Sequence, residues 1–126
     1  MDTNIKENKN NVGDIKNNNI DEKYKLDLSG KYLGNEGIQK LINYKDIIEL
    51  YLSLNNISDI KVLEKVKFNK LEILYLGSNE ISNNINILEN VNFNELKELK
   101  LCHNNITDIK VLENLKLKFK NIKLYV

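Results

Sequence analysis

The stretch ELYLSLNNISDIKVLEKVKF, residues 49–68, occurs three times in this chain with few changes. The second copy is ILYLGSNEISNNINILENVNF, from residue 73, and the third is ELKLCHNNITDIKVLENLKL, from residue 98. Each contains Leu-x-Leu-x-x-Asn-x-Ile, and the copies start 24 and then 25 residues apart. Such a period is typical of units that stack in a row, so the sequence predicts a solenoid whose function lies on a surface and not in a catalytic cleft.

Each copy predicts one very short strand at Leu-x-Leu, because side chains alternate along a strand and the two leucines then point to the same side. Asn55, Asn79 and Asn104 follow where the chain turns, and a short amide there can bond the backbone of its own and the neighbouring loop. The later apolar positions predict a tightly wound return segment, 3₁₀ or irregular, with one inward face. These positions are Ile60/Leu63/Val66/Phe68, Ile85/Leu88/Val91/Phe93 and Ile109/Leu112/Leu115/Leu117.

The middle copy has one extra residue, at Asn84 or its neighbour, which we expect in an exposed loop that includes Asn83. No long helix is expected outside residues 34–46. A weaker copy precedes the three, with Lys31 in place of the asparagine, and Phe119, Ile122 and Leu124 fit the opening of a fifth. We therefore predict an α/β right-handed solenoid over residues 23–126, with a parallel concave sheet of four or five strands. Residues 1–22 are polar, rich in Asn and Lys and without periodicity, which predicts a disordered tail.

These residues resemble the leucine-rich-repeat family over residues 24–126. Within it, they are similar to the short-repeat class of the protein phosphatase-1 regulatory subunit and the outer-arm dynein light chain, whose repeats run L-x-x-L-x-L-x-x-N-x-I-x-x-I-x-x-L. The third copy matches that pattern from Leu96 through Asn104 to Leu112. The resemblance implies a leucine-rich-repeat solenoid that binds a protein partner, although members of this class usually have more repeats.

Composition argues against several other functions. All 19 basic residues are lysines and the net charge is only +1, so we expect no nucleic-acid binding. The first 20 residues lack the apolar core of a signal peptide and no run reaches membrane-spanning length, so we expect no membrane partner. Cys102 is the single cysteine, which excludes an intrachain disulfide. We expect a cytoplasmic protein, with the nucleus as the other intracellular compartment.

Catalysis and metal binding find little support in the residue types. Cys102 and His103 are neighbours, but adjacent side chains on a strand point to opposite faces and the chain offers no third residue to orient the pair. One cysteine and one histidine fall short of the three or four ligands that zinc requires. We therefore predict a protein that is not an enzyme and that has no catalytic residues, cofactor or metal.

The exposed residues of the concave sheet are the candidate binding site. The predicted column between the paired leucines contains Asp27, Tyr51, Tyr75, Lys100 and Lys123, and the column before them contains Lys25, Glu49, Ile73, Glu98 and Asn121. Adjacent strands lie about 4.8 Å apart, so the two tyrosines should be neighbours with the isoleucine beside them. We predict a partner-binding site of Tyr51, Tyr75, Ile73, Lys100, Glu49, Glu98 and Lys123. The competing interpretation is that tyrosines simply suit strands.

The favoured function is a non-enzymatic protein-interaction module that binds its partner through the concave sheet. The alternative is an effector-like or structural short repeat protein, viral or parasitic, that masks another protein's surface. The last predicted strand, residues 121–126, is apolar and terminal, and it predicts weak self-association through this C-terminal edge.

Overall fold

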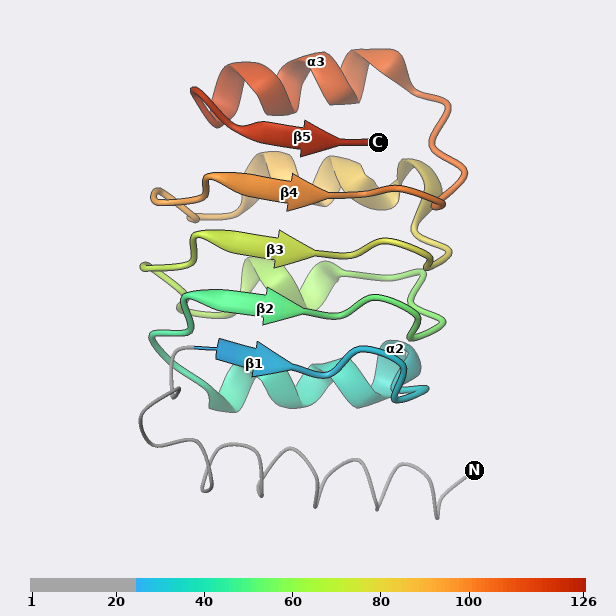
Figure 1. The fold of residues 1–126 in the computed structure, drawn as a ribbon, viewed down its shortest axis with the longest axis vertical. Helices are drawn as coiled ribbons and strands as arrows, with labels where there is room; N and C mark the ends of the chain where they lie inside the picture. The colour runs from blue at the N-terminus through green and yellow to red at the C-terminus, as the bar shows by residue number, and fades with distance from the viewer. Residues whose placement is uncertain (1–24) are drawn as a thin grey trace.

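A computed structural model describes residues 25–126, and each sequence copy is one turn of a coil in it (Figure 1). The disordered tail predicted for residues 1–22 lies outside the described residues. The elements are, in chain order, β1 (Lys25–Asp27), α2 (Gly34–Gly37), η1 (Ile38–Asn43), β2 (Glu49–Tyr51), η2 (Lys61–Glu64), β3 (Ile73–Tyr75), η3 (Ser82–Asn90), β4 (Glu98–Lys100), α3 (Ile109–Lys118) and β5 (Lys123–Tyr125).

The five strands form one parallel sheet in the order β1-β2-β3-β4-β5, so each turn of the coil adds one strand beside the previous one. The central leucines of the strands are in register, from Leu26 through Leu50, Leu74 and Leu99 to Leu124. The helical segments return the chain behind this sheet (Figure 1). The predicted α/β leucine-rich-repeat solenoid, with its five-stranded parallel sheet, is confirmed.

The core is one continuous cluster of apolar side chains between the sheet and the return segments. Leu50, Leu52, Ile57 and Ile60 of the second repeat are fully buried, and so are their counterparts in the third. A three-residue strand buries too little surface to be stable alone, so each repeat depends on the leucines of its neighbours.

The asparagines tie each repeat to the one before it. The Asn79 side-chain oxygen accepts from the N–H groups of Asn55 and Ile57, both at 3.0 Å. Its amide nitrogen donates to the carbonyls of Leu52 at 3.1 Å and Leu76 at 2.9 Å. Each asparagine thus reaches back to the loop of the preceding repeat. In the first described repeat Lys31 stands at the asparagine position, and its own N–H donates to the Asn55 side-chain oxygen at 3.1 Å.

Left-handed backbone recurs at one position of each turn, two residues after the second leucine. Gly30, Leu54, Ser78 and His103 occupy it, with φ values of 68°, 60°, 56° and 60°. Since asparagine tolerates this conformation better than most residues, the second member of the pair Asn104–Asn105, with φ 56°, also has a backbone role.

From the second repeat to the fourth the return segments lengthen, and the last of them is α-helical. Aromatic residues Phe68, Phe93 and Phe119 end them, 13, 14 and 15 positions after Asn55, Asn79 and Asn104. The corresponding helices are four and nine residues of 3₁₀-helix and then ten residues of α-helix.

The expectation of no long helix outside residues 34–46 is therefore wrong for α3. Its inward face is Val111 and Leu115, four residues apart as an α-helix requires, while Ile109 and Leu117, predicted inside, are 70% and 75% exposed. The side chain of Asp108 caps the helix by accepting from the Val111 N–H at 3.2 Å.

Asn83 is exposed as predicted, but its side chain makes hydrogen bonds to the next repeat. Its oxygen accepts from the N–H groups of Thr107 at 3.1 Å and Asp108 at 3.0 Å, and its amide donates to the Thr107 hydroxyl. Asn35 makes the equivalent bonds to Ser58 and Asp59. A second set of asparagines thus joins repeats at the turn into the return segments.

The register of β5 differs from the prediction by two residues. Lys123 pairs with Glu98, and Tyr125 pairs with Lys100. The prediction aligned Phe119 with the consensus leucines, but this residue belongs with Phe68 and Phe93 at the end of the return segment. Its backbone shows this, since the Ile122 N–H donates to the Phe119 carbonyl just as the Leu96 N–H donates to that of Phe93.

Candidate functional site

Two columns of side chains project from the concave side of the sheet, because residues on either side of each central leucine point away from the core. The middle column is Asp27, Tyr51, Tyr75, Lys100 and Tyr125, and the outer column is Lys25, Glu49, Ile73, Glu98 and Lys123. We call these ten residues the concave face.

Tyr51 and Tyr75 contact each other at the centre of this face. Their ring centroids lie 4.8 Å apart with the planes at 87°, an edge-to-face arrangement favoured by the ring quadrupoles. The Tyr51 hydroxyl donates to the Glu49 carboxylate at 2.6 Å, and the Tyr75 hydroxyl donates to that of Glu98 at 2.5 Å. Both rings are half-buried, so each presents part of its surface to solvent while its hydroxyl is fixed.

Lysine side chains continue the column of rings on both sides. The Lys100 ammonium lies 4.3 Å from the Tyr75 ring centroid and 5.3 Å from that of Tyr125, and the Lys25 ammonium lies 5.6 Å from that of Tyr51. Cations at these distances from a ring are attracted by its negative face. The contacts therefore run from Lys25 of β1, in the outer column, through Tyr51, Tyr75 and Lys100 to Tyr125 of β5 in the middle column.

The surroundings raise the pKa of both tyrosines above the ordinary value of 10. For Tyr51 burial is the largest cause, followed by the hydrogen bond to Glu49 and the charge of that carboxylate. For Tyr75 the hydrogen bond to Glu98 comes first and burial second, while Lys100 opposes them. A phenol that donates to a carboxylate resists ionisation, so both hydroxyls remain donors well above neutral pH.

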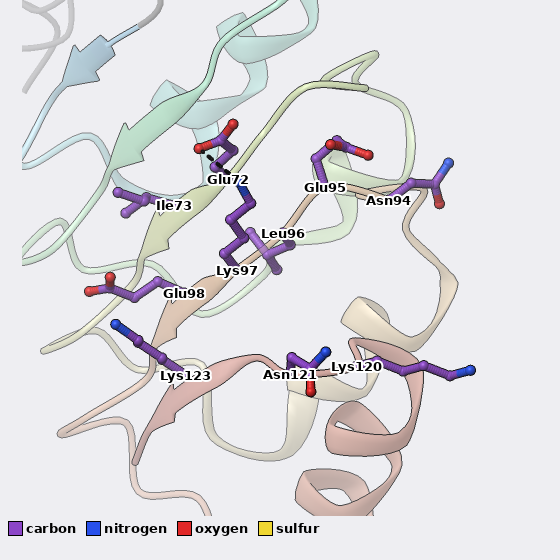
Figure 2. A pocket seen from close by; sticks show the side chains of 10 residues that line it. All are labelled: Glu72, Ile73, Asn94, Glu95, Leu96, Lys97, Glu98, Lys120, Asn121 and Lys123. Atoms are coloured by element: carbon purple, nitrogen blue, oxygen red, sulfur yellow. Dashed lines mark ion pairs between the residues drawn. The ribbon is translucent and has the colours of Figure 1, made fainter.

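Next to the outer column lies a hollow of about 600 Å³, where the chain enters strands β3, β4 and β5 (Figure 2). The Glu72 and Lys97 side chains form an ion pair across it, at 3.6 Å. Glu98, Ile73 and Lys123 belong to both the concave face and the hollow. The full lining is Glu72, Ile73, Asn94, Glu95, Leu96, Lys97, Glu98, Lys120, Asn121 and Lys123.

The structure brings six of the seven predicted site residues into one contiguous patch: Tyr51, Tyr75, Ile73, Lys100, Glu49 and Glu98. Lys123 is on the same face but beside Glu98, one column away from its predicted place next to Lys100. Tyr125 was not predicted as a candidate site residue, because the sequence alignment of β5 was two residues out of register. The position of Phe119, which corresponds to those of Phe68 and Phe93 at the end of the return segment, could have indicated the correct register. The hollow had no sequence signal, since it is lined by loop residues of three repeats.

Cys102 and His103 follow strand β4 in the turn that leads to Asn104. Within the described residues Cys102 is half-exposed and in no disulfide, and His103 is an exposed residue of the left-handed turn. Within residues 25–126, no group of three or more His, Cys, Asp or Glu side chains could hold a metal ion. Over the same residues, no helix has the length and apolar character needed to cross a membrane.

Comparison with known proteins gives distant similarity to solved structures alone. The chain matches no protein-family model and no curated protein sequence. Among solved structures it is similar to an internalin from Listeria monocytogenes, with 24% identity over 71% of this chain and a TM-score of 0.40. The match covers 30% of the internalin chain. The leucine-rich-repeat fold is therefore read from the coordinates themselves, from the sheet, the repeat period and the ladder of Asn55, Asn79 and Asn104.

Proposed function

We propose that this protein is a non-enzymatic interaction module that binds a protein partner through the concave face. The observation that carries the proposal is the pair Tyr51–Tyr75, half-exposed at the centre of the sheet with both hydroxyls held by carboxylates. Tyrosine is among the residues that contribute most to binding energy at protein interfaces.

The geometry favours tight contact at low entropic cost. A free side chain that becomes fixed on binding costs about 0.5–1.5 kcal/mol. The rings of Tyr51 and Tyr75 are already restrained by Glu49, Glu98 and each other, so less of this cost remains to be met in the complex. Lys100, which lies between Tyr75 and Tyr125, is restrained in the same way.

The size of the sheet limits what it can bind alone. Five strands span roughly 19 Å across, and three residues span roughly 10 Å along a strand, which together make a floor of roughly 200 Å². A stable interface buries about 800 Å² on each partner. A tight partner must therefore extend beyond the sheet, and the hollow that shares Ile73, Glu98 and Lys123 with the concave face is the adjoining surface it would fill.

The decisive experiment is partner capture from cells of the source organism, measured by quantitative mass spectrometry with three variants. Tyr51→Ala/Tyr75→Ala should lose the partner, while Lys61→Ala/Lys65→Ala, exposed on the return side, should retain it. Tyr51→Phe/Tyr75→Phe keeps the rings and removes the hydroxyls, so it should capture less partner than the native chain and more than the double alanine variant. Far-UV circular dichroism and the thermal midpoint of each variant show that loss of capture is not loss of folding.

Retained capture by the double alanine variant would move the binding site off the concave face. The same experiment bears on two finer proposals. Similarity to the short-repeat class of the phosphatase-1 regulatory subunit and the dynein light chain predicts a signalling or cytoskeletal partner from the same cell. The effector-like alternative predicts that the captured protein comes from a host.

A further inference from the structure

The C-terminal end of the coil differs in charge from the rest of the described chain. Residues 109–126 contain five lysines and one glutamate, whereas residues 25–108 contain ten lysines and twelve acidic residues. A segment of net +4 therefore follows a body of net −2, although the whole chain is nearly neutral. The lysines are Lys110, Lys116, Lys118, Lys120 and Lys123, and all are exposed.

The same end carries the last strand of the sheet in the described residues. Over residues 25–126, β5 lies at one edge of the sheet and β1 at the other (Figure 1). The Lys123 N–H donates to the Lys97 carbonyl and the Tyr125 carbonyl accepts from the Leu101 N–H, so both groups point towards β4. Backbone groups of alternate residues on a strand point to opposite sides, so the N–H and C=O of Leu124 face outwards.

Apolar side chains are exposed in the same C-terminal segment. Of the large hydrophobic residues that are exposed in the described chain, four belong to the last 18 residues: Ile109 at 70%, Leu117 at 75%, Tyr125 at 43% and Val126 at 58%. An open strand edge with apolar neighbours is a template for pairing with another extended chain.

We propose that the β5 edge binds an extended acidic peptide segment of a partner protein as an added strand. The Leu124 backbone supplies directional hydrogen bonds, the exposed apolar side chains supply contact area, and the lysines select a negatively charged sequence. Lys120, Asn121 and Lys123 also line the hollow at the start of β5, which gives an acidic side chain a place beside the strand.

Charge favours this occupant over a second copy of the chain, which is the weak self-association that the sequence predicts at the same edge. Contact between two β5 edges would place two segments of net +4 together, and the first repeat, residues 25–48, has four lysines and three acidic residues, so it is not an acidic match for a head-to-tail contact either. An anionic lipid surface would match the lysines but would make no use of the outward backbone groups of Leu124. The combination of a basic surface and an open strand edge therefore points to a peptide.

The test uses the whole chain and a short fluorescent peptide of alternating glutamate and valine, with binding measured by fluorescence anisotropy at low salt. Three controls define the mode of binding: the same peptide with lysine for glutamate, the glutamate peptide N-methylated at every residue, and phosphatidylserine vesicles. We expect the glutamate peptide to bind, the lysine peptide not to bind, and N-methylation to weaken binding about tenfold or more because the strand loses its donors.

Variants locate the site. Lys116→Glu/Lys118→Glu/Lys120→Glu should weaken binding about tenfold, and the matched reversal Lys61→Glu/Lys65→Glu/Lys67→Glu on the middle repeats should have little effect. Leu124→Pro, which removes the outward N–H and is tolerated on an edge strand, should abolish binding. Tyr51→Ala/Tyr75→Ala should bind normally, which separates this site from the concave face.

The proposal is overturned by binding that survives N-methylation and Leu124→Pro, by equal binding of the lysine peptide, or by binding of vesicles without binding of the peptide. It is also overturned if sedimentation of the unliganded chain shows dimers through the β5 edge, because a second copy then occupies it. Glutamate-peptide binding that both the triple reversal and N-methylation weaken supports it.

Discussion

Residues 55–64 (NNISDIKVLE) and 104–113 (NNITDIKVLE) differ at a single position, Ser58 against Thr107, yet they fold differently. In the second repeat the segment ends in the 3₁₀-helix Lys61–Glu64, and Ile60 is fully buried. In the fourth it starts the α-helix Ile109–Lys118, and the matching Ile109 is 70% exposed.

Two features outside the shared segment account for this difference. The return from the asparagine to the closing phenylalanine is 13 positions in the second repeat and 15 in the fourth. An α-helix advances about 1.5 Å per residue and a 3₁₀-helix about 2.0 Å, so the longer segment covers a similar distance as an α-helix. In addition, η2 contacts both η1 and η3, whereas α3 contacts η3 and has no later return segment against it in the described chain. Segment length and place in the stack thus override local sequence.

The largest expected effect compares the same residue in the two settings. Ile60→Ala should cost about 2–4 kcal/mol of unfolding free energy, because it leaves a cavity in a closed core. Ile109→Ala should stay within about 0.5 kcal/mol, as an exposed substitution does. Urea denaturation followed by circular dichroism measures both, and equal costs would mean that the two isoleucines share one environment.

Asn79→Ala should cost about 1–3 kcal/mol, because the N–H groups of Asn55 and Ile57 would lose their acceptor in a buried loop. In residues 25–126 no later asparagine does this for the matching loop at Asn104. After the substitution, the loop at Asn55 resembles the loop at Asn104, because neither accepts the side chain of an asparagine from a later described repeat. A thermal midpoint equal to that of the native chain would show that the asparagine ladder does not hold the stack together.

The two aspartates of the shared segment should differ by a smaller amount. Asp108 caps α3 through the Val111 N–H, while Asp59 accepts from the Lys61 N–H at 2.9 Å in an exposed turn. Asp108→Ala should cost about 1 kcal/mol and reduce helical signal at 222 nm. Asp59→Ala should leave that signal unchanged. A larger helical loss from Asp59→Ala would place the regular helix in the wrong repeat.

The smallest effect is expected from exchanging the one residue that differs. Ser58→Thr with Thr107→Ser should change stability by less than about 0.5 kcal/mol. The two hydroxyls make equivalent bonds, to the amides of Asn35 and Asn83. Movement of the α-helix to the second repeat, seen in NMR chemical shifts, would mean that this residue and not the surroundings decides the fold.

The structural features that recur in every repeat could be predicted from the sequence. The period, the strand leucines and the asparagines predicted the sheet and the contact between Tyr51 and Tyr75, because stacking copies in register leaves few choices. Stacking in register also predicted that Glu49 and Glu98 would lie near the tyrosines, although not that they would bond the hydroxyls.

The errors fall where the repeat pattern ends. DIKVLE has the same letters in both copies, so no local pattern could assign α-helix to one and 3₁₀-helix to the other. The two extra residues before Phe119 then displaced the alignment, which put Lys123 beside Lys100 and kept Tyr125 out of the middle column. The hydrogen bonds of Asn83 to Thr107 and Asp108 were not predicted, because an exposed side chain in a loop gives no sequence signal of its partners in the next repeat.

The central claim is that the place of a segment in the stack outweighs its local sequence. Its most direct test is hydrogen exchange of the two near-identical segments, measured by NMR under native conditions. Because residues 59–64 and 108–113 share their sequence, their intrinsic exchange rates nearly cancel in the ratio. In the described chain α3 packs against one neighbouring return segment and η2 packs against two. We therefore predict that amides of 108–113 exchange at least about tenfold faster than those of 59–64. Equal protection of the two segments, or greater protection of 108–113, would contradict the account.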